Sequence, residues 1–152
     1  MRTIGLRATP SVLTFVVYES DDNSILNVED IKIPLAFSMP DALKYIRNNV
    51  LDILREYEIS RAGIRITESN SQTLKIERIQ IEGVLQEAFA SSNIQNYFVG
   101  QISSISARLG IPRADFKFYA EGMKAWEIDG WNMLTTVNQR EALFCAVGAS
   151  RA

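Results

Sequence analysis

The sequence contains no histidine and only one cysteine among its 152 residues. Histidine is the commonest transition-metal ligand and the usual general base near neutral pH, so other residues must supply both roles. Any metal site would have to use carboxylates and backbone oxygens, which are the ligands that suit Mg²⁺ or Mn²⁺. Cys145 has no partner for a disulfide within the chain. It lies in the apolar run 142–147, and this setting is typical of a buried structural thiol.

Long apolar runs and an excess of one charge are also missing. No stretch of about 18 apolar residues is present, so we expect no membrane span. The first residues lead directly into a strand pattern without the apolar core of a signal peptide, which makes the cytoplasm the expected compartment. The net charge is −2, whereas a non-specific nucleic-acid binder usually carries a basic surplus. No nucleotide-binding fingerprint appears, and we expect no cofactor.

The patterns that are present predict one α/β domain over residues 1–152. β-branched and aromatic residues at 3–8, 12–19 and 25–33, separated by short turns, predict an antiparallel meander. Hydrophobic periodicity then predicts a helix from Ser38 to Tyr57, a strand at 62–67, a helix at 74–90, a strand at 97–100, and helices at 102–109 and 137–149. Residues 113–132 show no clear element. A helix between two strands indicates a crossover with parallel pairing.

Gly83 interrupts the second predicted helix. Glycine inside a helix is unfavourable by about 1 kcal/mol relative to alanine. We expect close packing of this helix onto the sheet to compensate for that cost.

The order of elements, β-β-β-α-β-α-β-α-α, resembles the ribonuclease H-like fold and, within it, the RuvC-type Holliday-junction resolvases. In that family the first strand reads Ile-Gly-Ile-Asp-Pro-Gly, and Ile4-Gly5-Leu6-Arg7 occupies the same pattern here. The family has Ile-Glu at the end of the fourth strand, where this chain has Ile64-Arg65-Ile66. The last helix of the family carries two acids in Asp-Ala-Ala-Asp-Ala-Leu-Ala, matched here by residues 138–143, Asn-Gln-Arg-Glu-Ala-Leu. The resemblance covers nearly the whole chain and implies a mixed five-stranded sheet flanked by helices.

The resemblance also implies a chemistry, which is phosphodiester hydrolysis by two divalent cations held between four carboxylates. Carried over position by position, Arg7, Arg65 and Asn138 replace three of these acids, and only Glu141 keeps a carboxylate. At about 4 Å and an effective dielectric near 20, each contact between like unit charges costs roughly 4 kcal/mol. We therefore expect no bound metal and no catalytic residue at these positions.

An active site rebuilt from neighbouring acids is the alternative, with Glu68, Glu77 and Glu82 as its candidates. Glu68 could reach back from the polar loop that follows the predicted strand. Glu77 and Glu82 are five residues apart on the predicted helix and do not share one face cleanly.

Arg7 and Arg65 should lie side by side at the carboxyl ends of two adjacent parallel strands. Ligands of open α/β sheets bind at this edge. Two interpretations stand for the pair. Either both arginines form an internal salt bridge with Glu141, or they bind a phosphate or a partner's carboxylate, which the arginine fork fits.

Trp126 and Trp131 belong to the aromatic-rich segment 113–132, in which basic and acidic residues alternate with the rings. These rings cover one end of the core, or they anchor a protein interface. They could also stack on nucleic-acid bases, although the acidic residues of the segment cancel the positive field that such binding needs.

Three functions are compatible with these features. The first is a catalytically inactive RuvC-like domain that acts as a protein-interaction or assembly subunit, as a homo-oligomer or with a protein partner, in a nucleic-acid-associated complex. The second is a non-catalytic binder of structured DNA or RNA, and the third is a divergent metal-dependent nuclease. The sequence favours the first function because three matched acids are missing together, although a fold by itself does not fix a function.

Overall fold

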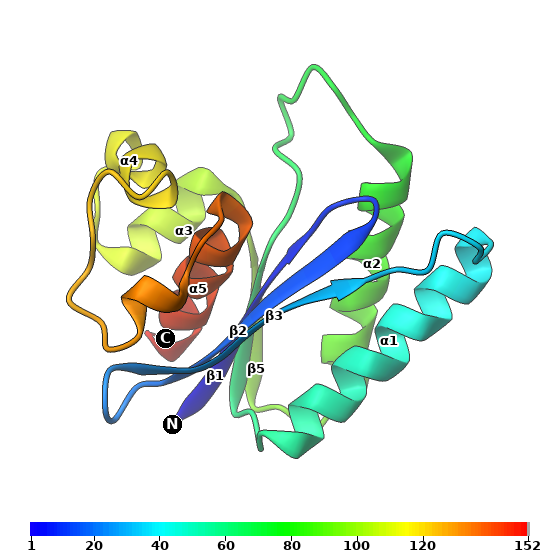
Figure 1. Cartoon of the computed structure of the whole chain (residues 1–152), viewed down its shortest axis with the longest axis horizontal. Helices are drawn as coiled ribbons and strands as arrows, with labels where there is room; N and C mark the ends of the chain where they lie inside the picture. Colours follow the sequence, from blue (N-terminus) through cyan, green and yellow to red (C-terminus); the bar gives the residue numbers. More distant parts are fainter. Residues whose placement is uncertain (152) are drawn as a thin grey trace.

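A five-stranded sheet with helices on both faces forms the centre of the computed structural model, which describes residues 1–151 (Figure 1). The strands are β1 (Arg2–Ala8), β2 (Val12–Glu19), β3 (Ser24–Lys32), β4 (Arg61–Arg65) and β5 (Asn96–Gly100). Their order across the sheet is β3-β2-β1-β4-β5. The pairs β1–β2 and β2–β3 are antiparallel, whereas β1–β4 and β4–β5 are parallel. The predicted meander and the predicted parallel crossover are both confirmed.

The helices form two layers around this sheet. They are α1 (Met39–Glu56), α2 (Ile76–Ser91), α3 (Ile102–Leu109), α4 (Phe116–Ala120) and α5 (Val137–Ser150), with 3-10 turns at Arg113–Asp115 and Trp131–Met133. Helices α1 and α2 cover one face, and α3, α4 and α5 lie on the other (Figure 1). Within residues 1–151, none of the helices combines the length and the apolar content of a membrane span.

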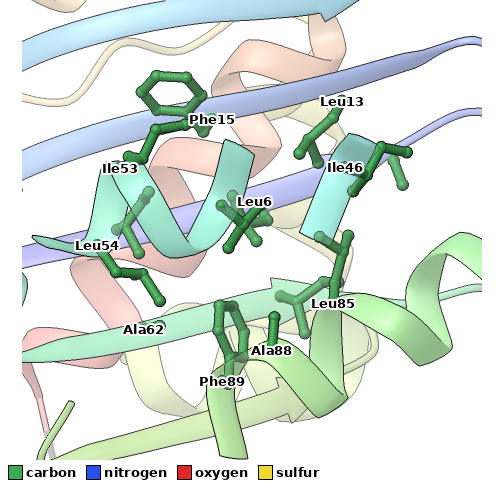
Figure 2. Packing of buried hydrophobic residues seen from close by; sticks show 14 of the residues in the cluster. Leu6, Leu13, Phe15, Ile46, Ile53, Leu54, Ala62, Leu85, Ala88 and Phe89 are labelled. Atoms are coloured by element: carbon green, nitrogen blue, oxygen red, sulfur yellow. The ribbon is translucent and has the colours of Figure 1, made fainter. Parts of the chain in front are cut away.

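The core on the α1–α2 face follows directly from the alternation of β1 and the periodicity of α1. Ile4 and Leu6 point to this face, and both are fully buried. Leu6, Ile46 and Leu85 meet there between the sheet and the two helices (Figure 2). Burial of one such side chain stabilises the fold by about 1.5–3 kcal/mol. This layer therefore fixes the direction and register of β1, on which the position of Arg7 depends.

The opposite face of β1 and β4 lies unusually close to α5. A Cβ atom on Gly5 would be 1.8 Å from the carbonyl oxygen of Ala142, and one on Gly63 would be 2.7 Å from that of Cys145. Both positions must therefore be glycine for α5 to rest directly on the backbone of the two strands. The close contact brings Glu141 of α5 to the ends of β1 and β4.

Gly83 is a position where the sequence-based expectation is wrong. It is exposed, and a Cβ atom built on it would meet nothing within 4 Å. Ile81 and Leu85, on the sheet side of the same helix, are fully buried. Contacts on the opposite side of α2 therefore hold this helix on the sheet, and packing within the chain does not offset the cost of the glycine.

Candidate functional site

Arg7 and Arg65 are register partners at the carboxyl ends of the parallel strands β1 and β4. Odd-numbered residues of β1 face α5, so the Arg7 side chain points toward that helix. The two residues are only 7% and 9% exposed. The Nη1 atom of Arg7 donates a hydrogen bond of 3.3 Å to the carbonyl oxygen of Arg65. The prediction that the two arginines lie side by side is confirmed.

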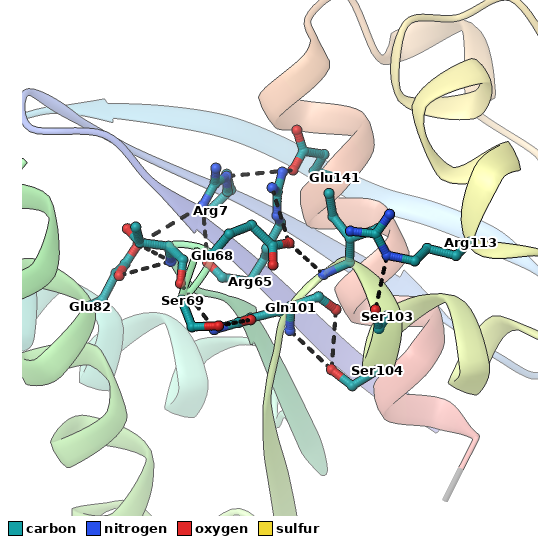
Figure 3. A network of polar contacts seen from close by, with 12 residues as sticks. Arg7, Arg65, Glu68, Ser69, Glu82, Gln101, Ser103, Ser104, Arg113 and Glu141 are labelled. Atoms are coloured by element: carbon teal, nitrogen blue, oxygen red, sulfur yellow. Dashed lines mark hydrogen bonds and ion pairs between the residues drawn. The ribbon is translucent and has the colours of Figure 1, made fainter. Parts of the chain in front are cut away.

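Glu141 forms ion pairs with both guanidinium groups (Figure 3). Its Oε1 atom is 3.5 Å from Nε of Arg7 and forms a direct ion pair with Nη1 of Arg65. The carboxylate is positioned by the start of α5, where the hydroxyl of Thr136 accepts a hydrogen bond of 3.1 Å from the amide of Gln139. The internal salt bridge, one of the two interpretations of the sequence, is therefore present. Glu141 is 4% exposed, so the salt bridge is shielded from solvent.

Two further carboxylates complete the cluster. Glu82 of α2 lies 3.9 Å from Nη1 of Arg7, and it accepts hydrogen bonds of 3.0 and 3.1 Å from the amide of Thr67. Glu68 lies 3.6 Å from Nη2 of Arg65 and accepts a hydrogen bond of 2.8 Å from the first amide of α3. Because the Thr67 amide bonds to Glu82, the strand β4 ends at Arg65 rather than at the predicted residue 67.

Charge balance explains how two arginines tolerate this degree of burial. Loss of hydration lowers the pKa of Arg7. Loss of hydration, and then the charge of Arg7, lower the pKa of Arg65 to about 10. Arg65 therefore stays cationic at pH 7. A buried charge without a partner would be strongly destabilising. Arg78 of α2 lies near Arg7 and Glu82, and burial also lowers its pKa. The carboxylates of Glu68, Glu82 and Glu141 therefore each lie within 4 Å of a buried guanidinium group of Arg7 or Arg65.

The residues of this cluster do not fit a pair of divalent cations. Glu68, Glu82 and Glu141 each have an oxygen within 4 Å of a guanidinium group. Within residues 1–151, no three side chains of His, Cys, Asp or Glu are placed to hold a metal ion. Asn138 is half-buried and, three residues before Glu141, would supply an amide in place of a carboxylate. Glu77 is exposed on α2 and makes none of the ion pairs of the cluster.

Cys145 is fully buried on α5, as the sequence predicts. Burial raises the pKa of its thiol to about 12, although the positive charges of Arg7 and Arg65 act in the opposite direction. A thiol with this pKa carries almost no thiolate at neutral pH and is a poor nucleophile.

A second polar bridge beside the cluster was missed by the sequence analysis. The hydroxyl of Thr14 donates a hydrogen bond of 2.6 Å to Oδ1 of Asp30, and Nε2 of Gln139 donates one of 3.1 Å to Oδ2. Thr14 is the register partner of Arg7 across β1–β2 and of Asp30 across β2–β3. Side-chain alternation along the predicted strands would have placed Thr14 and Asp30 on the same face of the sheet. No local pattern identifies Gln139, which lies on α5, as the residue that bonds to Asp30.

Trp126 and Trp131 lie in the aromatic layer on the α5 side of the sheet. The ring centroid of Trp126 is 4.9 Å from that of the fully buried Phe144, 5.3 Å from that of Tyr119 and 6.4 Å from that of Trp131. Both tryptophans are half-buried. These contacts support the interpretation that the rings cover one end of the core, and the two binding interpretations stay predictions.

Solved structures that share this arrangement include resolvases of Holliday junctions. The chain matches Thermus thermophilus RuvC, solved in complex with a Holliday junction substrate, with a TM-score of 0.73 at 14% identity, over 97% of this chain and 91% of that one. The chain has a RuvC-like fold. A second structure of T. thermophilus RuvC gives a TM-score of 0.70 at 13% identity, over 97% of this chain and 92% of that one.

The yeast mitochondrial Holliday junction resolvase Ydc2 gives a TM-score of 0.64 at 9% identity, over 97% of this chain and 78% of that one. No family model and no curated protein matches the sequence. The ribonuclease H-like, RuvC-like architecture is therefore confirmed as a fold, and the likeness at these identities does not extend to function.

Proposed function

We propose that this protein is a catalytically inactive RuvC-like domain that acts as an assembly subunit. The observation that carries this proposal is the buried cluster of Arg7, Arg65 and Glu141. It lies at the ends of β1 and β4, where the resemblance to RuvC-type resolvases places metal-binding acids. In this chain Glu141 is the one carboxylate that the resemblance matches, and Arg7 and Arg65 neutralise its charge.

Electrostatics opposes metal binding at this cluster. A divalent cation at about 4 Å from a guanidinium group meets a repulsion of roughly 8 kcal/mol at an effective dielectric near 20. A cation held by Glu141 would meet this repulsion from both arginines, because each of them lies within 4 Å of the Glu141 carboxylate. Hydrolysis of the family's type needs two such ions at about 3.5–4 Å from each other.

The assembly role is supported by apolar residues on the outer face of α2 and just before its first residue. Leu74, Ile76 and Ile79 are 58%, 68% and 42% exposed, and Gly83 opens directly to solvent one turn further along. Ile76, Ile79 and Gly83 follow helical spacing and share one side of the helix. We call these four residues the α2 stripe. Contiguous exposed apolar residues of this kind mark interaction surfaces in soluble proteins.

We assign the α2 stripe to a second copy of the chain, with a two-fold axis passing near Gly83. Helices that pack antiparallel across this axis can approach closely because both carry glycine at the crossing point. Two-fold symmetry repeats each of these contacts.

The mass of the protein in solution tests the assembly role. Sedimentation equilibrium should give twice the mass of one chain. Ile79→Glu, which places a charge in the α2 stripe, should give a monomer. The matched control is Met123→Glu, since Met123 is a 67% exposed apolar residue outside the stripe and should leave the dimer intact. A monomeric unmodified protein, or a dimer that survives Ile79→Glu, would contradict this role.

Incubation with a four-way DNA junction and Mg²⁺ or Mn²⁺ tests the inactivity. We expect no cleavage by the unmodified protein or by Glu141→Ala. Cleavage that disappears in Glu141→Ala would instead support a divergent nuclease. The alternative function, binding of structured DNA or RNA, predicts a gel shift of the junction that weakens steeply as salt is added.

A further inference from the structure

A cavity of about 320 Å³ lies between the ends of α3 and α5 and the segment 125–128. In Figure 1 this segment passes beside the C-terminal end of α5. Its lining includes Asn23, which belongs to the turn between β2 and β3, next to the amino end of β1. The arginine cluster is at the carboxyl end of β1, so the two sites are at opposite ends of the sheet. The cavity is not part of the site described above.

Hydrogen bonds from Asn23 hold the cavity open in its present shape. The Nδ2 atom of Asn23 donates to the carbonyl oxygen of Glu127 at 2.7 Å, and its Oδ1 atom accepts from the hydroxyl of Tyr18 at 2.7 Å. The backbone of Asn23 has a φ of 51°, and its carbonyl oxygen accepts from the amide of Asp129 at 3.1 Å. The wall at 127–129 is therefore pinned to the sheet, and the cavity is preformed.

The lining has the composition of a small-molecule site. Leu109, Ile111 and Val147 supply aliphatic surface, and Trp126 supplies an aromatic ring. The volume is at the lower end of the range for ligand pockets, which is about 300–1,000 Å³. A flat ring system of one or two rings fits this space and this lining.

Arg151 and Glu127, which carry opposite charges, are both among the residues that line the cavity. The Nη1 atom of Arg151 donates to the carbonyl oxygen of Leu109 at 2.8 Å, which holds this guanidinium beside the cavity. Glu127 is exposed, and its carboxylate takes part in none of the ion pairs found in residues 1–151. One basic, one acidic and one aromatic residue thus border the cavity.

We propose that this cavity binds a nucleobase together with its 5′-phosphate. The base stacks on Trp126, since every base presents a π-face. The phosphate pairs with Arg151, whose fork matches its oxygens. The carboxylate of Glu127 accepts a hydrogen bond from an exocyclic amino group, which adenine, cytosine and guanine carry and uracil lacks. A free nucleotide and an unpaired base in a strand present the same chemistry.

Fluorescence of Trp126 tests this proposal, in a Trp131→Phe variant where Trp126 is the remaining tryptophan. AMP should quench the emission saturably, and UMP should bind at least about tenfold more weakly because it lacks the amino group. Arg151→Gln should weaken AMP binding at least about tenfold. The control Arg55→Gln changes an exposed arginine on the other face of the sheet and should leave AMP binding unchanged. Glu127→Gln should reduce the preference for AMP over UMP.

Binding assays with a single-stranded oligoadenylate and with a blunt-ended duplex distinguish a free nucleotide from an unpaired base in a strand. Binding of AMP alone supports a free nucleotide as the ligand, and binding of the single strand in preference to the duplex supports an unpaired base. Saturation-transfer NMR from the unmodified protein to the base protons of AMP measures binding without any substitution. Absence of both quenching and transfer at about 10 mM nucleotide, a concentration at which binding of millimolar affinity is detectable, would overturn the proposal. Equal effects of Arg151→Gln and Arg55→Gln would also overturn it.

Discussion

Replacing Glu141 by glutamine removes one negative charge from the cluster and changes little else in shape. The amide would leave Arg7 and Arg65 buried beside each other without the carboxylate they share. Glu82 and Glu68 would stay in place, but each is 3.6 Å or more from its arginine and is held by a backbone amide. The two cations would therefore lose their closest counter-charge inside a nearly water-free site.

The expected cost follows from the burial of all three side chains. Removing one partner from a buried ion pair costs about 3–5 kcal/mol, out of a total stability of about 5–15 kcal/mol for a protein of ordinary size. With a urea m-value of about 2 kcal/mol/M, the midpoint of unfolding should fall by about 2 M. Urea denaturation followed by far-UV circular dichroism, at one fixed protein concentration, measures this shift.

Glu87→Gln is the matched control, because Glu87 pairs with Arg47 at 2.6 Å on the surface, where the side chains are 51% and 37% exposed. Such a pair contributes about 0–1 kcal/mol. A double variant, Arg65→Met with Glu141→Met, should be less destabilised than the sum of its two single variants, since it leaves fewer uncompensated charges. If Glu141→Gln costs no more than Glu87→Gln, the cluster is not an internally balanced ion network, and the reasoning is refuted.

Two other features of the chain lead to further predictions. Gly5→Ala should destabilise the protein by more than about 3 kcal/mol, because its Cβ would lie 1.8 Å from the carbonyl oxygen of Ala142, whereas Gly83→Ala in the monomeric Ile79→Glu background should stabilise it by about 0.5–1 kcal/mol. Thermal melts of the two variants test this contrast. The thiol of Cys145 has its pKa raised from 9.0 to about 12 by burial, so the folded state keeps a proton that the unfolded state loses. Its contribution to stability is full below pH 9 and is lost as the pH rises toward 12, by about 1.4 kcal/mol per pH unit. Denaturation at pH 8 and pH 10 should show this loss in the unmodified protein and not in Cys145→Ala.

Local patterns predicted most of the fold because each element carries its own periodicity. The β-branched and aromatic residues at 12–19 and the apolar spacing of 102–109 predicted the bounds of β2 and α3 as observed. Residues 113–132 gave no such pattern, since α4 has only five residues and the rest of this segment is turns held by aromatic contacts. Short elements of this kind are stabilised by tertiary packing and not by local propensity.

The candidate site was partly predictable for a related reason. Parallel pairing of two strands is enough to place Arg7 beside Arg65, and the residue matched to the last helix identified Glu141 as their partner. The roles of Glu82 and Glu68 depend on how the loop after β4 and the start of α3 fold back over the arginines. These are long-range contacts that a linear pattern does not encode. For the same reason the sequence predicts a packed face at Gly83, where the structure has an open one.

Anomalous X-ray scattering from crystals equilibrated with Mn²⁺ tests the central claim most directly, because it locates the metal and the arginines together. We expect no manganese peak at the ends of β1 and β4, and we expect the guanidinium groups of Arg7 and Arg65 to contact the Glu141 carboxylate. A manganese ion bound to Glu141 and Glu82, with the arginines turned away, would contradict it.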